Sequence, residues 1–225
     1  MIAPAIRLFA VAAAAGLSVA CAATGGRSAS GPVLTGAAAG IAQARRDSLR
    51  YAYTAADIRF MSGMIGHHAQ AIVMAKWAPS HGANPAVIRL TERVVNAQTD
   101  EINLMQGWLR DRLQPVPEPD PRGMKMMMNG MEHVMAMPGM LTDEQMRELD
   151  AARGGDFDRL FLTFMIQHHR GAVAMVQELL SSYGAAQDET VFKFASDVSV
   201  DQTTEINRMI QMLLELGSPP FTSTP

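Results

Sequence analysis

The sequence predicts an all-α protein, a four-helix bundle made of two repeated helical hairpins joined by a long Met-rich crossover. The chain contains an internal repeat, because MIGHHAQAIVMA at 64–75 returns as MIQHHRGAVAMV at 165–176. Each copy is followed by a second shared segment, QTDEINLMQGWL at 98–109 and QTTEINRMIQML at 202–213. Apolar residues in all four segments recur at three- and four-residue steps, the period of a helix. Short connections within each half favour antiparallel neighbours.

Capping and helix-breaking residues indicate where each helix begins and ends. Thr54, with Asp57 three residues later, predicts the start of the first helix. Asn84-Pro85 predicts the start of the second, and Gly154-Gly155-Asp156 that of the third. The remaining breaks are predicted at Pro79, Pro115, Tyr183-Gly184 and Gly217. The predicted divisions are therefore a first hairpin at 54–113, a connector at 114–155, a second hairpin at 156–217 and a tail at 218–225.

The N-terminal segment is typical of an export signal. Residues 1–21 carry an early positive charge at Arg7, an apolar run too short for an ordinary membrane span, and small residues before Cys21. The stretch LSVAC resembles a bacterial lipoprotein signal and predicts a lipid anchor on Cys21; ordinary cleavage after Ala20 is the alternative. Residues 22–53 predict a flexible tether. The protein is expected in the cell envelope, on its periplasmic or extracellular face, touching the membrane only through that anchor.

The composition points away from nucleic acid and toward soft metal ions. The formal net charge of −3 offers no electrostatic attraction for a phosphate backbone. Many of the 18 methionines lie in the connector, which begins PVPEPDPRG at 115–123 and continues MKMMMNGMEHVMAMPGM at 124–140. A mobile thioether-rich loop of this kind could capture soft ions and pass them on. After it, Thr142 and Gln145 predict a capping box and a short helix to about Ala152.

The histidine pairs carry the main functional hypothesis. Residues three or four apart share a helix face, so Met64 lies on the side of both His67 and His68, and Met61 joins that face one turn earlier. Met74 is seven residues from His67, or ~10 Å along the axis, and is expected to serve a second site with another helix. The second half has the same arrangement, with Met165 beside His168 and His169.

The partner helices also place polar residues on one stripe each. Gln98, Glu101 and Met105 form one stripe. Its counterpart in the second half is Gln202, Glu205 and Met209. A glutamate that faces a histidine could orient it, ionise it, or act as a ligand itself.

Ligand chemistry favours copper. Imidazole suits copper, zinc, iron and nickel, whereas thioether is soft and selects Cu(I). The same softness extends to Ag(I), and Cu(II) is a further alternative. Outside the cytoplasm thiols tend to form disulfides, but a thioether cannot. We therefore expect metal binding for sequestration, delivery or resistance, with other copper-handling envelope proteins as partners and no catalytic residues, although a redox role stays open.

Several plainer interpretations remain open at this stage. Each histidine pair could be structural, and the Met-rich connector could be an oxidant trap or a docking surface of a metal-free interaction module. His81 is expected to be an exposed loop residue. A carboxylate-bridged di-iron site is a further alternative, but it needs a Glu three residues before a histidine, and neither histidine pair has one.

The segments FMSGMIGHHAQAIVMA, NAQTDEINLMQGWL, MPGMLTDEQM and FDRLFLTFMIQHHRGAVAMV together resemble the bacterial family called domain of unknown function 305. The resemblance covers roughly 55–216 and implies a ferritin-like four-helix bundle exported to the cell envelope. It also implies copper and silver binding through histidine and methionine. By position, the implied ligands are Met64, His67, His68, Met74, Met165, His168, His169 and Met175. Additional candidates from the patterns above are Met61, Glu101, Glu205, Met128, Met131, His133, Met137 and Met140.

Overall fold

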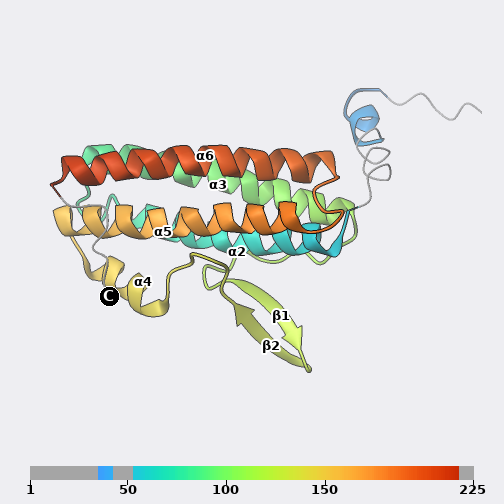
Figure 1. Ribbon diagram of the computed structural model, residues 1–225, viewed down its shortest axis with the longest axis horizontal. Helices are drawn as coiled ribbons and strands as arrows, with labels where there is room; N and C mark the ends of the chain where they lie inside the picture. The colour runs from blue at the N-terminus through green and yellow to red at the C-terminus, as the bar shows by residue number, and fades with distance from the viewer. Residues whose placement is uncertain (1–34, 43–52, 218–225) are drawn as a thin grey trace, which may run out of the picture.

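Four long helices lie side by side in the computed structural model, which describes residues 35–42 and 53–217 (Figure 1). They are α2 (Ala55–Trp77), α3 (Pro85–Asp111), α5 (Gly154–Ser181) and α6 (Glu189–Glu215). Helix α2 packs mainly on α3, and α5 packs on α6. Contacts between α2 and α5 then join the two hairpins. The predicted all-α architecture of two repeated helical hairpins is confirmed.

The predicted caps explain where three of the helices begin. The Thr54 hydroxyl accepts from the backbone N–H groups of Ala56 and Asp57, and the Asp57 carboxylate accepts from the Thr54 N–H. Asn84 caps α3 ahead of a proline in its first turn. The short helix α4 (Asp143–Ala151) begins with the predicted Thr142 capping box. Such caps satisfy backbone donors that have no partner within the helix.

Each half of the bundle also holds a loop of the other half. Asp57 of α2 accepts a hydrogen bond from the N–H of Ala186, in the loop before α6, at 2.7 Å. Its repeat counterpart, Asp158 of α5, accepts from the N–H of Asn84, before α3, at 3.0 and 3.2 Å. Both carboxylates are buried. Equivalent carboxylates of the two repeats thus hold the two hairpins against each other.

The end of the bundle near α6 contains a buried ion pair. Asp188 caps α6 by accepting from the N–H groups of Thr190 and Val191. The same carboxylate accepts from the Trp108 indole N–H at 3.0 Å and from Arg112. Both charged side chains are almost fully buried, at 7% and 4% exposure. Removing one partner would leave a buried charge without compensation.

The connector contains a β-hairpin, which the sequence analysis did not predict. Strand β1 (Met124–Met128) pairs antiparallel with β2 (Met131–Met135), and the hairpin extends away from the helices (Figure 1). Asn129 and Gly130 join the strands with φ values of 53° and 77°. Two positive φ angles define a type I′ turn, for which Asn-Gly is the strongest short signal. This stretch is therefore a β-hairpin where the sequence analysis expected a loop.

The rest of the connector is seated on the bundle through glycines. At Gly171 of α5, an added Cβ would lie 1.9 Å from the Pro138 carbonyl oxygen. At Gly66 of α2, it would lie 2.8 Å from the Gly123 backbone. Gln70 of α2 completes the attachment, because its amide binds both the N–H and the carbonyl of Leu141. Only glycine permits so close an approach of two backbones.

Part of the N-terminal predictions lies outside the described residues. Residues 36–42, inside the predicted tether, are helical. The proposed signal, Cys21 and the tail at 218–225 are not within the described ranges.

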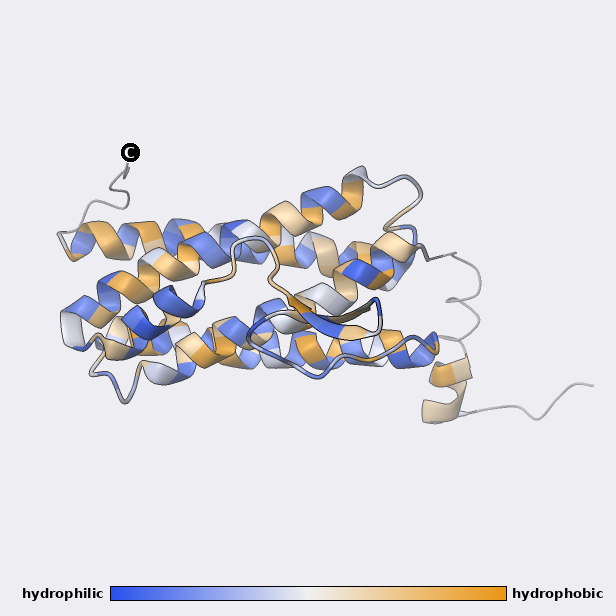
Figure 2. Ribbon diagram, turned by 90° about the horizontal axis from the view of Figure 1, so that it is seen from below, coloured by the Kyte–Doolittle hydropathy of each residue, from blue (hydrophilic) through white to orange (hydrophobic). Residues whose placement is uncertain are grey.

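Along the long helices, apolar and polar residues alternate (Figure 2). No helix of the described part combines the length and hydropathy that crossing a bilayer requires.

Candidate metal centre

The two histidine pairs meet in the centre of the bundle. His67 of α2 and His168 of α5 have ring centroids 3.8 Å apart, with an angle of 38° between the ring planes. All four histidines of the repeat are 0% exposed. The sequence left open whether the two pairs form one group or two, and the structure joins them in a single layer, which we call the histidine layer: His67, His68, His168 and His169.

The outer histidine of each pair contacts a glutamate of the neighbouring helix. His68 Nε2 lies 2.6 Å from a carboxylate oxygen of Glu101 in α3. His169 Nε2 lies 2.6 Å from a carboxylate oxygen of Glu205 in α6. The glutamates keep 22% and 25% side-chain exposure, so they stand between the buried histidines and solvent. The equal distances follow from the repeat.

Several imidazole nitrogens in the layer lack any hydrogen-bond partner among the described residues. His67 Nε2 lies 3.1 Å from the Pro138 carbonyl oxygen, so this nitrogen donates and Nδ1 keeps its lone pair. The Nδ1 atoms of His68 and His169 are also buried without a partner, and His168 has none at either nitrogen. Buried polar atoms of this kind are rare in folded proteins, because each one costs free energy.

Burial keeps the central imidazoles neutral. Desolvation, with a further contribution from the nearby His68, lowers the pKa of His67 to about 3. Desolvation and then the neighbouring His67 lower the pKa of His168 well below its ordinary value. Neutral imidazole is the form that coordinates a metal ion, so at neutral pH no proton competes with a cation for these nitrogens.

Buried methionines lie on both sides of the histidine layer. One hydrophobic cluster contains Met61, Met64, Met105 and Met175. The other contains Met74, Met165, Met209 and Met212. Met74 is therefore grouped with Met165 of the opposite half rather than with Met64, as the separation along α2 required. The structure brings the four implied histidines together and divides the implied methionines between these two clusters, whereas their role as ligands stays a prediction.

The additional candidates of the connector are divided between two places. Met140 is buried, and Met137 is half-buried against α2, where its sulfur would be 2.8 Å from a Cβ at Gly63. Met131 and His133 are exposed on β2. Met128 ends β1, opposite Met131 in the register. The exposed residues Met131 and His133 do not join the histidine layer.

His81 corrects one sequence-based expectation. It is only 5% exposed, and its Nε2 donates to the backbone oxygen of Asp150 at 3.0 Å. Its own carbonyl accepts from the N–H of Gly154, at the start of α5. The short stretch PSHG at 79–82 has no helical periodicity and was therefore expected to be a solvent-facing turn. In the structure, its histidine is hydrogen-bonded to Asp150 and Gly154, so it connects this turn to the segment before α5.

Sequence reasoning also missed the backbone contribution of the connector. The Pro138 carbonyl that contacts His67 approaches because Gly171 has no side chain. Helical glycines in the middle of apolar segments were a usable signal, since glycine weakens a helix unless close packing requires it. Gly63 and Gly66 in α2 carry the same signal.

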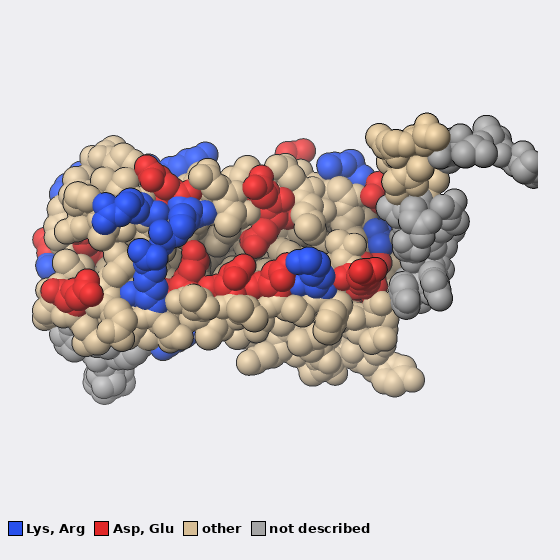
Figure 3. Space-filling model, turned by 90° about the horizontal axis from the view of Figure 1, so that it is seen from above, with Lys and Arg blue, Asp and Glu red and all other residues tan. Residues whose placement is uncertain are grey.

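An acidic groove opens over the outer edge of the layer. Asp and Glu form a row along the face that carries α3 and α6 (Figure 3). The groove has a volume of about 260 Å³ and is lined in part by Glu101, Asp201 and Glu205. Burial, followed by the nearby carboxylates, raises the pKa of Asp201. Negative charge concentrated in a groove attracts cations.

The carboxylates are arranged unlike those of a di-iron centre. Glu101 and Glu205 each contact a different histidine. Within residues 35–42 and 53–217, no three His, Cys, Asp or Glu side chains gather closely enough to hold an ion.

Comparison with known proteins agrees with this fold. The sequence matches the family described as domain of unknown function (DUF305) over residues 57–213. The chain belongs to the DUF305 family. A DUF305 protein from Streptomyces coelicolor, described as a candidate secreted protein, has 29% identity and a TM-score of 0.62. That alignment covers 74% of this chain and 97% of the other.

Another similar structure is that of CopM in its Cu(I)-bound form, with 27% identity and a TM-score of 0.55 over 73% of this chain and 98% of CopM. CopM is also known in Cu(II)-bound and Ag-bound forms. An uncharacterised protein of Acanthamoeba polyphaga mimivirus is 36% identical over 56 residues, or 25% of this chain. The match spans only 37% of that relative's length. The predicted family is thus confirmed.

Proposed function

We propose that this DUF305 protein is an exported metal-binding protein whose cargo is Cu(I). Ag(I) would be accepted by the same ligands, and Cu(II) is the alternative oxidation state. The similarity to CopM, which is known in Cu(I)-, Cu(II)- and Ag-bound forms, supports a role in copper handling. The role is sequestration, delivery or resistance rather than catalysis.

The observation that carries the proposal is the set of unpartnered, neutral imidazole nitrogens in the histidine layer. His168 keeps both nitrogens free of hydrogen bonds, and His67 faces it with a free Nδ1 at a ring separation of 3.8 Å. A purely structural polar layer would satisfy its own donors and acceptors. The thioethers on either side of the layer extend the soft donor set.

The outer residues would regulate access to the site. Glu101 and Glu205 are partly exposed in the acidic groove and contact His68 and His169. A cation drawn to this groove would meet carboxylates first and imidazoles beneath them. Second-sphere carboxylates of this kind orient histidine ligands and raise their basicity.

Export and anchoring belong to the same proposal. Residues 1–21 would direct the chain out of the cytoplasm, and a lipid on Cys21 would hold it at the membrane. The description of the Streptomyces coelicolor relative supports export. Other copper-handling envelope proteins would then be the partners in delivery.

The test is a competition between the purified metal-free protein and a chromophoric Cu(I) chelator under anaerobic conditions. We expect the wild type to withdraw Cu(I) from the chelator, and the double variant His67→Leu/His168→Leu to lose at least one bound equivalent. The control is His81→Gln, which changes a buried histidine outside the layer. Unchanged stoichiometry and affinity in the double variant would refute the proposal.

The metal-free interaction module makes a different prediction. Protein purified from copper-supplemented cells would then contain no metal by elemental analysis, although the fold is intact. A di-iron protein would instead take up two equivalents of iron and consume oxygen. The Cu(I) proposal requires copper in the purified protein and a lower copper content in the double variant.

A further inference from the structure

The β-hairpin has two chemically different faces. Residues that lie opposite each other in an antiparallel pair share a face, and so do alternate residues along each strand. The register pairs Met124 with Met135 and Met126 with His133. Sulfur and imidazole donors therefore follow one face toward Met131 near the tip. We call this the soft face: Met124, Met126, Met131, His133 and Met135.

The opposite face carries ordinary surface residues. Lys125 lies opposite Val134, and Met127 lies opposite Glu132. An ion pair at 3.0 Å joins Lys125 to Glu132 across the strands. The concentration of soft donors is therefore a property of one face and not of the whole hairpin.

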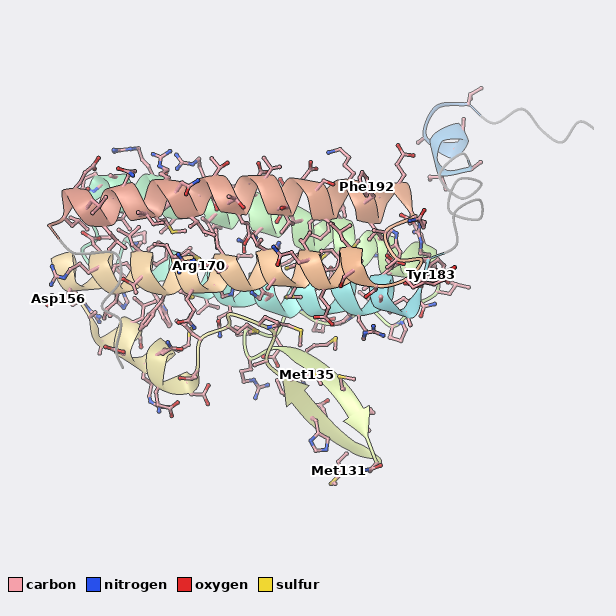
Figure 4. All side chains as sticks on the ribbon, viewed as in Figure 1. Met131, Met135, Asp156, Arg170, Tyr183 and Phe192 are labelled. Atoms are coloured by element: carbon pink, nitrogen blue, oxygen red, sulfur yellow. The ribbon has the colours of Figure 1, made fainter. Side chains whose placement is uncertain are left out.

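Packing does not explain the exposed part of the soft face. Met131 is 62% exposed and Met135 is 44% exposed, although a hydrophobic contact would remove them from water. Figure 4 shows Met131 toward the tip and Met135 toward the bundle. A hairpin that needed only to be stable would place Val, Ile or Thr at these positions.

The soft face ends at a cavity between the hairpin and the bundle. This cavity has a volume of about 190 Å³, and its lining includes Met124, Met135, Met137 and Met175. Met124 and Met135 come from opposite strands, Met137 from the following loop and Met175 from α5. Four methionines from separate segments therefore line one small space, together with the charged residues Arg59 and Glu178.

The cavity adjoins the histidine layer without including it. Pro138 also lines the cavity, and its carbonyl contacts His67. Met137 packs against Gly63, which precedes His67 by one helical turn. A Cβ added at Gly63 would lie 2.8 Å from the Met137 sulfur. Any larger residue at position 63 would push this thioether out of its place.

We propose that Met124, Met135, Met137 and Met175 form a second binding site for a soft monovalent ion, and that the soft face of the hairpin leads to it. The inference deepens the proposed function, because it assigns the same class of cargo to a second place. Neutral thioethers bind soft d10 ions such as Cu(I) and Ag(I) and compete poorly with water for hard cations. The Met126–His133 pair supplies a further donor pair between the tip and the site.

The experiment uses Ag(I) as the probe, because it is soft and is not oxidised by air. The full-length protein, with methionine methyl groups labelled with ¹³C, is titrated by NMR, and the stoichiometry is measured by calorimetry. We expect the Met124 and Met135 methyl signals to shift. In Met124→Leu/Met135→Leu, one bound equivalent should be lost or weakened at least about tenfold, since even outer-shell changes alter metal affinity by ~10–100-fold.

The control is Met127→Leu, which removes a 69% exposed thioether from the opposite face of the same strand. Its Ag(I) stoichiometry should equal that of the wild type. Equal losses in both variants, or no loss in the Met124→Leu/Met135→Leu variant, would overturn the second site. Circular dichroism verifies that each variant folds.

The double variant His67→Leu/His168→Leu separates this inference from the function on which it rests. If it still shows the Met124 and Met135 shifts but binds fewer ions, both sites stand. If it binds Ag(I) and Cu(I) as the wild type does, the histidine layer is refuted, while the hairpin site stands on its own shifts.

Discussion

Replacing His168 with leucine should stabilise the metal-free protein, although it removes a buried side chain from the middle of the bundle. His168 is 0% exposed, and neither of its ring nitrogens has a hydrogen-bond partner. Leucine is similar in size to imidazole and has no polar atoms to satisfy. If this histidine is present to bind an ion, its unpaired nitrogens should lower the free energy of unfolding whenever the ion is removed.

The expected magnitude follows from opposing contributions. Each buried polar atom without a partner costs about 1–3 kcal/mol. The substitution also loses the ring contact with His67, worth about 0.5–1.5 kcal/mol, and packs imperfectly at a cost of up to about 1.5 kcal/mol. Two such nitrogens cost about 2–6 kcal/mol, so the middle of each range leaves a net gain of about 2 kcal/mol in the free energy of unfolding, or roughly 4–8 °C in Tm for a domain of this size.

The assay is urea denaturation of chelator-treated protein at neutral pH, followed by circular dichroism. The matched control is His169→Leu, because that histidine is equally buried but has Nε2 on Glu205. Its loss of a charge-assisted hydrogen bond, worth about 1.5–3 kcal/mol, should offset the relief of its single unpartnered nitrogen. A destabilisation of His168→Leu by more than about 1 kcal/mol would refute the reasoning, since it would mean that the imidazole is well satisfied without an ion.

Three further measurements test the rest of the structure. The pKa of His67 is lowered to about 3, so as the pH falls the unfolded chain binds a proton at this histidine before the folded protein does. The metal-free protein should therefore lose stability as the pH falls from about 6.5 toward 3. His67→Leu should make the free energy of unfolding depend less steeply on pH in this range. Gly171→Ala should destabilise the protein by about 2–4 kcal/mol, because its Cβ would meet the loop backbone at 1.9 Å. The control Gly107→Ala in α3 meets nothing closer than 4.0 Å and should stabilise the protein by about 0.5–1 kcal/mol. Equal changes in the free energy of unfolding, measured with urea, would contradict the close packing. Asp188→Ala, which breaks the buried ion pair, should lower the free energy of unfolding by about 3–5 kcal/mol, measured by thermal unfolding. The control Asp197→Ala breaks an exposed ion pair and should cost less than about 1 kcal/mol. Similar losses in the two variants would show that the buried pair stabilises the fold no more than the exposed one.

The helical part of the fold could be predicted because it depends on local information. Thr54 and Thr142 are followed by residues that complete a capping box, and the structure begins helices there. The internal repeat then implied two similar hairpins, since the same sequence pattern buries the same face. These signals act over a few residues, so no knowledge of the tertiary structure was needed.

The contacts of the site could be predicted only in part. Helix periodicity places Met64 beside His67, but it does not determine which faces of α2 and α5 meet, and the 3.8 Å approach of His67 to His168 results from that packing. The hairpin was missed for a different reason. Its strands consist largely of methionine, which has no β preference, and only Asn129-Gly130 indicated the turn.

The connector makes the two central histidines unequal, although the repeat makes their helices equivalent. Pro138 contacts His67 and fixes its tautomer, whereas neither ring nitrogen of His168 forms a hydrogen bond with a described residue, although the His67 backbone lies near its ring. Gly171 explains this contact, because it lets the Pro138 backbone approach the bundle closely. His67 is therefore oriented in advance with Nδ1 as its free donor, while His168 can offer either nitrogen.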